Sequence, residues 1–216
     1  MNRSSYADRA EAGDVLSQHL SKFTDRDDVL VLALPRGGVP VAARVADALH
    51  ASLDVIIVGK IGHPRHHELA IGAIASTGGD VEIVRNDVVL SRGDVSEQVF
   101  TQTCVREMEE IRRRTAAYRG QRAVTSVADR CVILVDDGVA TGSTMRAAIA
   151  AVLRQQPRRL VVAVPIGAAQ TCAELAEEVD EVICPWTPEP FWAVGPGYLD
   201  FTQVDDAQVR LLLGRG

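Results

Sequence analysis

The chain has 216 residues, of which 47% are hydrophobic, and a formal net charge of −6, so we expect one α/β domain over residues 1–216 with a sizeable core. The acidic balance argues against nucleic acid as a partner, and no apolar run approaches the length of a membrane span or forms a signal segment. Because the four cysteines form no Cys-x-x-Cys pair, a zinc ribbon is disfavoured and a reducing, cytoplasmic location is expected.

The first part of the chain predicts a βαβ unit. An amphipathic helix over residues 4–23 precedes a nearly all-apolar strand at residues 29–34, a helix of small residues at 39–49 and a second buried strand at 55–58. Apolar runs of this kind are typical of strands in a parallel sheet, and their alternation with helices indicates βαβ construction.

Residues from about 59 to 80 are polar, basic and rich in glycine, so we expect a mobile loop there that acts as a lid. Residues 71–75 and 81–84 predict a short hairpin. The loop also contains three histidines, which we interpret as exposed rather than metal-bound because no cysteine or carboxylate pattern accompanies them. They are His63, His66 and His67.

A long helix is predicted at residues 94–119, with Glu109/Arg113 and Glu110/Arg114 at a favourable i,i+4 spacing. Its arginine run, residues 112–114, is interpreted as a solvated helix face, with phosphate binding as the weaker alternative. Further strands are expected at residues 160–165 and 182–184, and further helices at 170–178 and 204–213. Residues 186–201 hold five of the nine aromatic residues and predict an irregular, fairly rigid flap.

The stretch from Val132 to Thr144 carries the chemistry. An apolar run, residues 132–135, leads directly into Asp136 and Asp137, and a glycine turn then leads into Thr-Gly-Ser-Thr and an alanine-rich helix. Ligands of open α/β sheets bind just past the carboxyl ends of the strands. The start of a helix favours a phosphate, whereas paired carboxylates need sugar hydroxyls or a cation. A phosphorylated sugar suits both features, because its phosphate can bind at the start of the helix and its hydroxyls can bind the paired carboxylates.

Two better-known phosphate-binding motifs do not fit this loop. A Walker A loop needs four residues between its glycines, followed by lysine, but three residues separate Gly138 from Gly142 and Ser143 follows. The dinucleotide fingerprint Gly-x-Gly-x-x-Gly does not occur in the loop either. The alternative is an ordinary βα turn in which the acids cap the helix, and this explains one aspartate but not two.

The sequence Asp-Asp-x-x-Ala-Thr-Gly-x-Thr after an apolar strand resembles the 5-phosphoribosyl-1-pyrophosphate (PRPP) loop of the type I phosphoribosyltransferases. From about residue 6 to the C-terminal helix, the chain is similar to a bacterial branch of that family whose acceptor is not established. The resemblance implies a three-layer α/β/α sandwich with a mostly parallel, twisted sheet and a small C-terminal hood at about residues 185–204. A homodimer is a further expectation, because dimers are common in the family.

The resemblance also implies roles for the residues of the motif. Asp136 and Asp137 would bind the 2- and 3-hydroxyls of ribose, and their negative charge would stabilise a developing oxocarbenium ion. Mg²⁺ prefers phosphate oxygens with one or two carboxylates, so it is expected to arrive with PRPP and to contact this pair indirectly. The 5-phosphate would be held by the residues that follow, namely Ala140, Thr141, Gly142, Ser143 and Thr144.

A second glycine-containing loop follows the first strand and therefore lies on the same rim of the sheet. Its glycines allow the backbone to approach an anion closely, and Arg36 can hold phosphate oxygens in a bidentate fashion. The loop resembles the pyrophosphate loop of the family; a glycine turn with a surface arginine is the alternative. The expected pyrophosphate contacts, which include two basic lid residues, are Pro35, Arg36, Gly37, Lys60 and Arg65.

The acceptor side of the site has fewer signals. Where hypoxanthine-type enzymes of the family often carry an aspartate, this chain has Ala140, as in the adenine-type enzymes. By analogy with a loop carboxylate in those enzymes, we expect Glu68 to transfer the proton of the acceptor base; a solvated loop acid is the alternative. Glu68 would complete a catalytic set with Asp136, Asp137 and Arg36. Planar bases stack on aromatic rings, and the hood residues expected to reach the acceptor are Phe191 and Trp192.

Together these features predict a Mg²⁺-dependent phosphoribosyltransferase that moves the phosphoribosyl group of PRPP to a nitrogenous base or related acceptor and releases pyrophosphate. The main alternative is a noncatalytic protein of the same fold that senses PRPP or nucleotides. A hydrolase is less favoured, because the chain contains no Gly-x-Ser-x-Gly nucleophile elbow.

Overall fold

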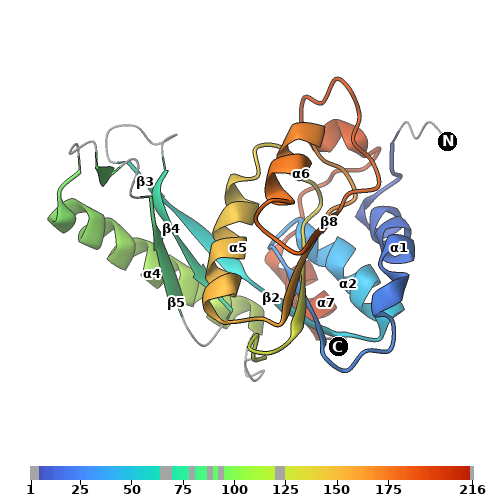
Figure 1. The fold of residues 1–216 in the computed structure, drawn as a ribbon, viewed down its shortest axis with the longest axis horizontal. Coiled ribbons are helices and arrows are strands. Elements are labelled where there is room, and N and C mark those ends of the chain that lie inside the picture. Colours follow the sequence, from blue (N-terminus) through green and yellow to red (C-terminus); the bar gives the residue numbers. More distant parts are fainter. Residues whose placement is uncertain are drawn as a thin grey trace.

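The computed structural model describes residues 5–63, 70–77, 81–86, 90–91, 95–119 and 125–214. Its centre is a five-stranded parallel sheet in the order β2-β1-β6-β7-β8, and a three-stranded antiparallel sheet, β3-β4-β5, lies beside it (Figure 1). The parallel strands are β1 (Val29–Ala33), β2 (Ser52–Val55), β6 (Cys131–Val135), β7 (Arg159–Ala163) and β8 (Glu181–Ile183). The antiparallel strands are β3 (Ile57–Gly62), β4 (Ala70–Ser76) and β5 (Val81–Arg85).

Helices bury both faces of the parallel sheet, which gives the three layers expected from the sequence. Residues at odd-numbered positions of β1 and β6 pack with α1, α2 and α7, and residues at even-numbered positions pack with α5 and α6. The strands are therefore apolar throughout, because each face of a parallel sheet needs apolar side chains. The helices in the described ranges are α1 (Arg9–His19), α2 (Gly38–Leu49), α4 (Glu97–Arg119), α5 (Ser143–Arg154), α6 (Ala169–Leu175) and α7 (Asp206–Leu213).

The single buried strand predicted at residues 55–58 is wrong, because two strands share this stretch. β2 ends at Val55, and the Ile56 N–H donates to the Ala33 carbonyl at 3.0 Å, where β1 also ends. Beyond this point β1 offers no further parallel partner, so β3 begins at Ile57 and pairs antiparallel with β4. The hairpin predicted from residues 71–75 and 81–84 is confirmed as β4 and β5.

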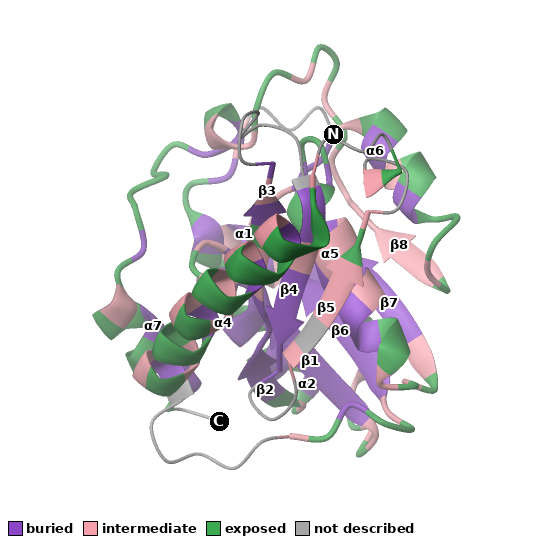
Figure 2. Cartoon of the chain, turned by 90° about the vertical axis from the view of Figure 1, so that its left-hand side faces the viewer, coloured by how far each residue is buried: buried purple, intermediate pink, exposed green. Residues whose placement is uncertain are grey.

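The described parts of the expected lid are strands rather than an open loop. Ile61, Ile71 and Ile74 are fully buried and pack in one cluster with apolar residues of α4, such as Phe100 and Ile111. Figure 2 shows the other face of α4 exposed along most of its length. The sequence predicted β4 and β5 but not the part of β3 around Ile61, which stands alone between glycines and a lysine.

Smaller differences concern helix ends and one histidine. Asp8 caps α1 by accepting a hydrogen bond from the Glu11 N–H at 2.9 Å, so the helix begins later than residue 4. His63 is 2% exposed, so its interpretation as an exposed loop residue is wrong. Between β8 and α7 the chain is irregular apart from a 3₁₀ turn at Gly195–Gly197, as the flap prediction requires. None of the described helices combines the length and the apolar character needed to cross a membrane.

Candidate functional site

Two loops leave the carboxyl edge of the parallel sheet side by side. β1 and β6 are adjacent with Ala33 opposite Val135, so the loop starting at Pro35 and the acid pair start at the same level. The side chain that a residue other than glycine would add at position 37 would collide with the Asp137 carboxylate. The contact between the loops thus explains the glycine. The peptide bond between Pro35 and Arg36 is cis.

The two carboxylates are each held by one oxygen. Asp136 Oδ1 accepts the Asp137 N–H at 2.8 Å, and Asp137 Oδ2 accepts from Nε and Nη2 of Arg9, both at 2.8 Å. No described residue donates a hydrogen bond to the other oxygen of either acid. Asp136 Oδ2 and Asp137 Oδ1 therefore accept no hydrogen bond from the described residues, and two such acceptors on adjacent residues suit a vicinal diol.

The electrostatics of the pair are set mainly by burial. Burial raises the pKa of Asp136 well above its usual value, and the charge of Asp137 raises it further. Burial also raises the pKa of Asp137, although Arg9 acts in the opposite direction. Tyr198 donates its hydroxyl to the Asp137 carbonyl, and its own pKa is raised by burial and by the charge of Asp137. Both carboxyl groups are thus harder to ionise than exposed acids, and Arg9 favours the charged form of Asp137.

Arg9 is a site residue that the sequence did not reveal. It is the first residue of α1 and lies 128 positions from Asp137. No motif or periodicity links positions so far apart, and Arg9 looks like any other charge on an amphipathic helix. Only the folded position of α1 brings the Arg9 side chain to Asp137.

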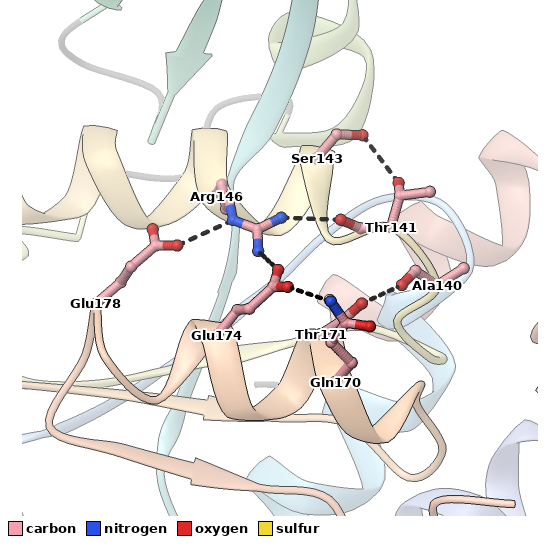
Figure 3. Close-up of polar contacts among 8 residues, drawn as sticks. All are labelled: Ala140, Thr141, Ser143, Arg146, Gln170, Thr171, Glu174 and Glu178. Carbon is pink, nitrogen blue, oxygen red and sulfur yellow. Dashed lines mark hydrogen bonds and ion pairs between the residues drawn. The ribbon is translucent and has the colours of Figure 1, made fainter. Parts of the chain in front are cut away.

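The expected 5-phosphate loop is held from outside by α5 and α6, as Figure 3 shows. Thr171 Oγ1 donates to the Ala140 carbonyl at 2.6 Å, and Arg146 Nη1 donates to the Thr141 carbonyl at 2.9 Å. In a trans peptide the N–H points opposite the C=O, so the amide of Thr141 faces away from Thr171 of α6 and the amide of Gly142 faces away from the guanidinium of Arg146. Gly142 has φ +73°, and no side chain among the described residues caps α5, which begins at Ser143. The arrangement leaves amide donors open to an anion.

Arg146 itself is fixed by two carboxylates. Its Nη2 lies 2.6 Å from Glu174 Oε2, and its Nε lies 2.9 Å from Glu178 Oε1. Arg146 and Thr171 were not expected from the sequence, because the carboxylates that hold Arg146 and the carbonyl that Thr171 binds each belong to a different βα unit. Together they connect the phosphate loop to α6 and to the turn that follows it (Figure 3).

The basic residues expected at the pyrophosphate lie in two neighbouring pockets. Lys60 lines a pocket of about 170 Å³ with Ser143 and Thr144, whereas Pro35 and Arg36 line another of about 240 Å³. Val58 lines both pockets, so β3 runs along the two. Arg65 lies outside the described residues, and so does Glu68.

The pocket at Arg36 also contains residues of α4 and α7. Arg36 Nη1 lies 3.7 Å from Asp206 Oδ1, and the other polar groups lining the pocket are Arg113, Arg114 and Tyr118. Both α4 arginines pair with Glu110, whose pKa they lower to about 2. The expected Glu110/Arg114 pair is thus present, while Arg113 pairs with Glu110 at i,i+3. The solvated-face interpretation missed that these arginines border a cavity beside the Pro35 loop.

The hood contains one aromatic pocket of about 180 Å³, lined by Phe191, Trp192, Trp186 and several prolines. Trp192 is 84% exposed, whereas Phe191 packs at the edge of a cluster formed by Tyr6, Tyr198 and Ile166. The ring centroids of Tyr6 and Trp186 are 5.6 Å apart, as are those of Tyr6 and Tyr198. Most hood aromatics therefore anchor the segment.

The donor set decides what kind of metal site fits. Within the described ranges, no group of three or more His, Cys, Asp or Glu side chains is arranged to hold a metal ion. The acid pair nevertheless offers two carboxylate oxygens without protein hydrogen bonds from the described residues. Two carboxylates fit an Mg²⁺ ion whose remaining ligands are phosphate oxygens and water, so the site suits a metal that binds with a phosphorylated ligand.

Comparison with known proteins identifies the family. Residues 4–200 match the family model described as the phosphoribosyl transferase domain, so the chain belongs to the phosphoribosyltransferase family. The crystal structure of TT1426 from Thermus thermophilus has the same fold, with 38% sequence identity, a TM-score of 0.85 and 97% of each chain covered.

Curated relatives point to the same family. Two Mycobacterium tuberculosis proteins, MT0597 and Rv0571c, are named as candidate phosphoribosyl transferases and are each 41% identical over 211 residues, which is 97% of this chain and 46% of theirs. The bifunctional protein PyrR of Clostridium acetobutylicum is 31% identical over 141 residues, or 65% of this chain and 58% of its own. The chain thus spans about half the length of the M. tuberculosis relatives.

Proposed function

We propose that this chain is a Mg²⁺-dependent phosphoribosyltransferase that takes PRPP as donor, transfers its phosphoribosyl group to a nitrogenous base or related acceptor, and releases pyrophosphate. The observation that carries the proposal is the pair of acceptor oxygens, Asp136 Oδ2 and Asp137 Oδ1, directly before an amide-lined loop. A ribose carrying a 5-phosphate has a diol for the first feature and an anion for the second.

The 5-phosphate end of PRPP is assigned to the loop of residues 140–144. The outward tethering of the Ala140 and Thr141 carbonyls supports this assignment, because it directs the following amides toward the ligand. Preorganised donors of this kind need no reorganisation when the anion binds. Lys60, in the pocket with Ser143 and Thr144, is proposed to contact phosphate oxygens from the opposite side.

The pyrophosphate end is assigned to Pro35, Arg36 and Gly37, with Arg65 of the lid. The pocket beside Arg36 supports this, because the guanidinium groups of Arg113 and Arg114 also border it. Mg²⁺, when bound with PRPP, would be held chiefly by phosphate oxygens beside Asp136 and Asp137 and would neutralise charge on the leaving pyrophosphate.

In the proposed reaction an acceptor nitrogen attacks the anomeric carbon as its bond to pyrophosphate breaks. The carboxylates of Asp136 and Asp137 hold the ribose hydroxyls and favour the positive charge that develops on the sugar. Phe191 and Trp192 are proposed to stack on the acceptor, and Glu68 is proposed to take its proton. Catalysis would rest on positioning and electrostatics rather than on a covalent intermediate.

The test is a panel of purine, pyrimidine and related bases incubated with PRPP and Mg²⁺, in which pyrophosphate release is measured. We expect release with at least one base, and a loss of roughly 100-fold or more in Asp137→Asn, as for other removals of a charge-stabilising group. Equal release by wild type and variant would remove the proposed role of that acid. Binding of PRPP without release for any base would favour the noncatalytic sensor instead.

A further inference from the structure

Arg9 lies where three segments of the chain meet. Its Nε and Nη2 each lie 2.8 Å from Asp137 Oδ2, and its Nη1 donates to the Thr202 carbonyl at 2.8 Å. The guanidinium carbon also lies 3.9 Å from the centre of the Phe201 ring. All three guanidinium nitrogens and one face of the group are therefore engaged by the acid pair and the end of the hood.

This ion pair differs from another that α1 makes. The side chains of Arg9 and Asp137 are 10% and 14% exposed, whereas those of Arg44 and Asp14, which join α2 to α1, are 49% and 48% exposed. Exposed pairs contribute little to stability. A buried pair is costly to desolvate and is often no more stable than apolar residues of the same size. Stability alone thus gives a weak reason for Arg9.

The geometry indicates a different reason. Arg9 takes only Oδ2 of Asp137, so the carboxylate has a fixed orientation and its Oδ1 is left for a ligand hydroxyl. Against the effect of burial, which raises the pKa of Asp137, the positive charge of Arg9 also lowers it. Because Phe201 and Thr202 hold the far side of the guanidinium, the orientation of Asp137 depends on the position of the hood.

We propose that Arg9 is a positioning residue for the ribose-binding carboxylate of Asp137, and that through it the end of the hood is coupled to the sugar site. This rests on the proposed function, in which Asp137 binds a ribose hydroxyl. Arg9 makes no contact with the sugar in this proposal; it acts through Asp137.

The experiment measures PRPP affinity by titration calorimetry in the presence of Mg²⁺ for the full chain and its variants. We expect Arg9→Gln to weaken binding at least about tenfold, the effect of a lost charge-assisted hydrogen bond. Arg9→Lys keeps the charge but not the two-nitrogen contact, so it should restore part of the affinity. Arg44→Gln removes the exposed pair of the same helix and should bind within about twofold of wild type.

A double-mutant cycle with Phe201→Leu separates positioning from a general packing effect. Phe201→Leu should weaken PRPP binding about threefold in the wild type and have no further effect in Arg9→Gln, because the ring acts on Asp137 through the guanidinium. Additive losses would mean that the two side chains act independently and would overturn the coupling.

Two other outcomes are decisive. If Arg9→Gln binds PRPP as tightly as wild type, the positioning role is wrong while the proposed function stands. If wild type itself binds no PRPP, the proposed function fails and this inference fails with it. Should Arg9→Gln not fold, Arg9→Lys carries the same test, and wild-type affinity in that variant overturns the proposal.

Discussion

At the scale of single residues, the two acids of the site differ in what holds them. Asp136 is partly buried, lies next to another carboxylate and accepts one backbone N–H, whereas Asp137 has a guanidinium partner. Burial and the charge of Asp137 raise the pKa of Asp136 above its value in the unfolded chain. Its contribution to stability is therefore fully present below the unfolded pKa of about 3.9, and is lost as the pH rises through the raised folded value.

We predict from this that Asp136→Asn raises the melting temperature at neutral pH while PRPP binding is lost. The asparagine oxygen still accepts the Asp137 N–H, and the gain is roughly 2–4 °C for each kcal/mol of penalty removed. Thermal unfolding from about pH 4 to pH 8 should show the gain vanishing near the unfolded pKa. Asp137→Asn should instead lower the melting temperature, because it leaves Arg9 buried without its partner, at a cost of about 3–5 kcal/mol. Shifts of the same sign in both variants would contradict this distinction.

A second prediction concerns the glycine between the two loops. Gly37 has φ −59° and ψ −37°, which alanine adopts readily, so any effect of Gly37→Ala must come from the collision with the Asp137 carboxylate. We expect PRPP affinity to fall at least about tenfold and the free energy of unfolding to fall by about 1–3 kcal/mol, as for other overpacked sites. Gly214→Ala is the control, because the atom nearest to its added methyl group, the Arg210 carbonyl oxygen, would be 3.3 Å away. Unchanged PRPP affinity in Gly37→Ala would mean that the loops separate at no cost to the site.

At the scale of elements, the loop of residues 140–144, which we propose binds the 5-phosphate, is held by a helix from the next βα unit, α6. Arg146 joins the loop carbonyl of Thr141 to Glu174 and Glu178 (Figure 3). Its side chain is 32% exposed, so the ion pairs themselves contribute little to stability. What the contact provides is the orientation of the peptide between Thr141 and Gly142.

We therefore predict that Arg146→Ala weakens PRPP binding more than it weakens the fold. One misdirected amide donor corresponds to a loss of about 0.5–1.5 kcal/mol, or roughly two- to tenfold in affinity, while the free energy of unfolding should change by less than about 1 kcal/mol. Calorimetric titration and denaturant unfolding measure the two quantities. Arg26→Gln removes a pair with Asp28 at the opposite end of β1 and should leave affinity unchanged; an equal loss there would show a nonspecific charge effect.

The elements also explain which features the sequence could predict. Apolar runs located every parallel strand except β2, and the common carboxyl edge of β1 and β6 brought the loops at Gly37 and Asp137 together, because both signals are local. β4 was predicted as part of a hairpin, but its partner β3 was missed because glycines and a lysine interrupt the apolar residues of β3. Arg9 was missed because it contacts a segment 128 positions away. Arg146 was missed because Glu174 and Glu178, which hold it, lie in another part of the chain. Such pairing leaves no periodic pattern in the sequence.

At the scale of the whole molecule, the rim of the parallel sheet is flanked by two additions. The antiparallel sheet and α4 lie on one side, and the hood and the start of the chain lie on the other (Figure 1). The first side brings Lys60 to the phosphate loop, and the second brings Arg9 and Tyr198 to Asp137. The arrangement of the site therefore depends on both additions.

Backbone hydrogen bonds join the hood to the segment before α1. The Tyr6 N–H donates to the Gly197 carbonyl and the Leu199 N–H donates to the Tyr6 carbonyl, both at 2.8 Å. The Tyr6 hydroxyl donates to the Pro165 carbonyl at 2.7 Å at a buried position. A segment that precedes α1 thus holds the hood against the end of β7.

We predict that Tyr6→Phe loosens the hood without unfolding the domain. The ring still packs on Tyr198, but the Pro165 carbonyl loses its buried donor, which costs about 1–3 kcal/mol. Hydrogen exchange should accelerate at the amides of Leu199 and Asp200, because their acceptors lie in the same N-terminal segment. Tyr118→Phe is the matched control: it removes the hydroxyl bond to Asp206 between α4 and α7, on the other side of the rim. The N-terminal segment, and not α4, shares these backbone hydrogen bonds with the hood. Faster hydrogen exchange in the hood of Tyr118→Phe, or unchanged exchange in Tyr6→Phe, would therefore contradict the view that the N-terminal segment fixes the hood.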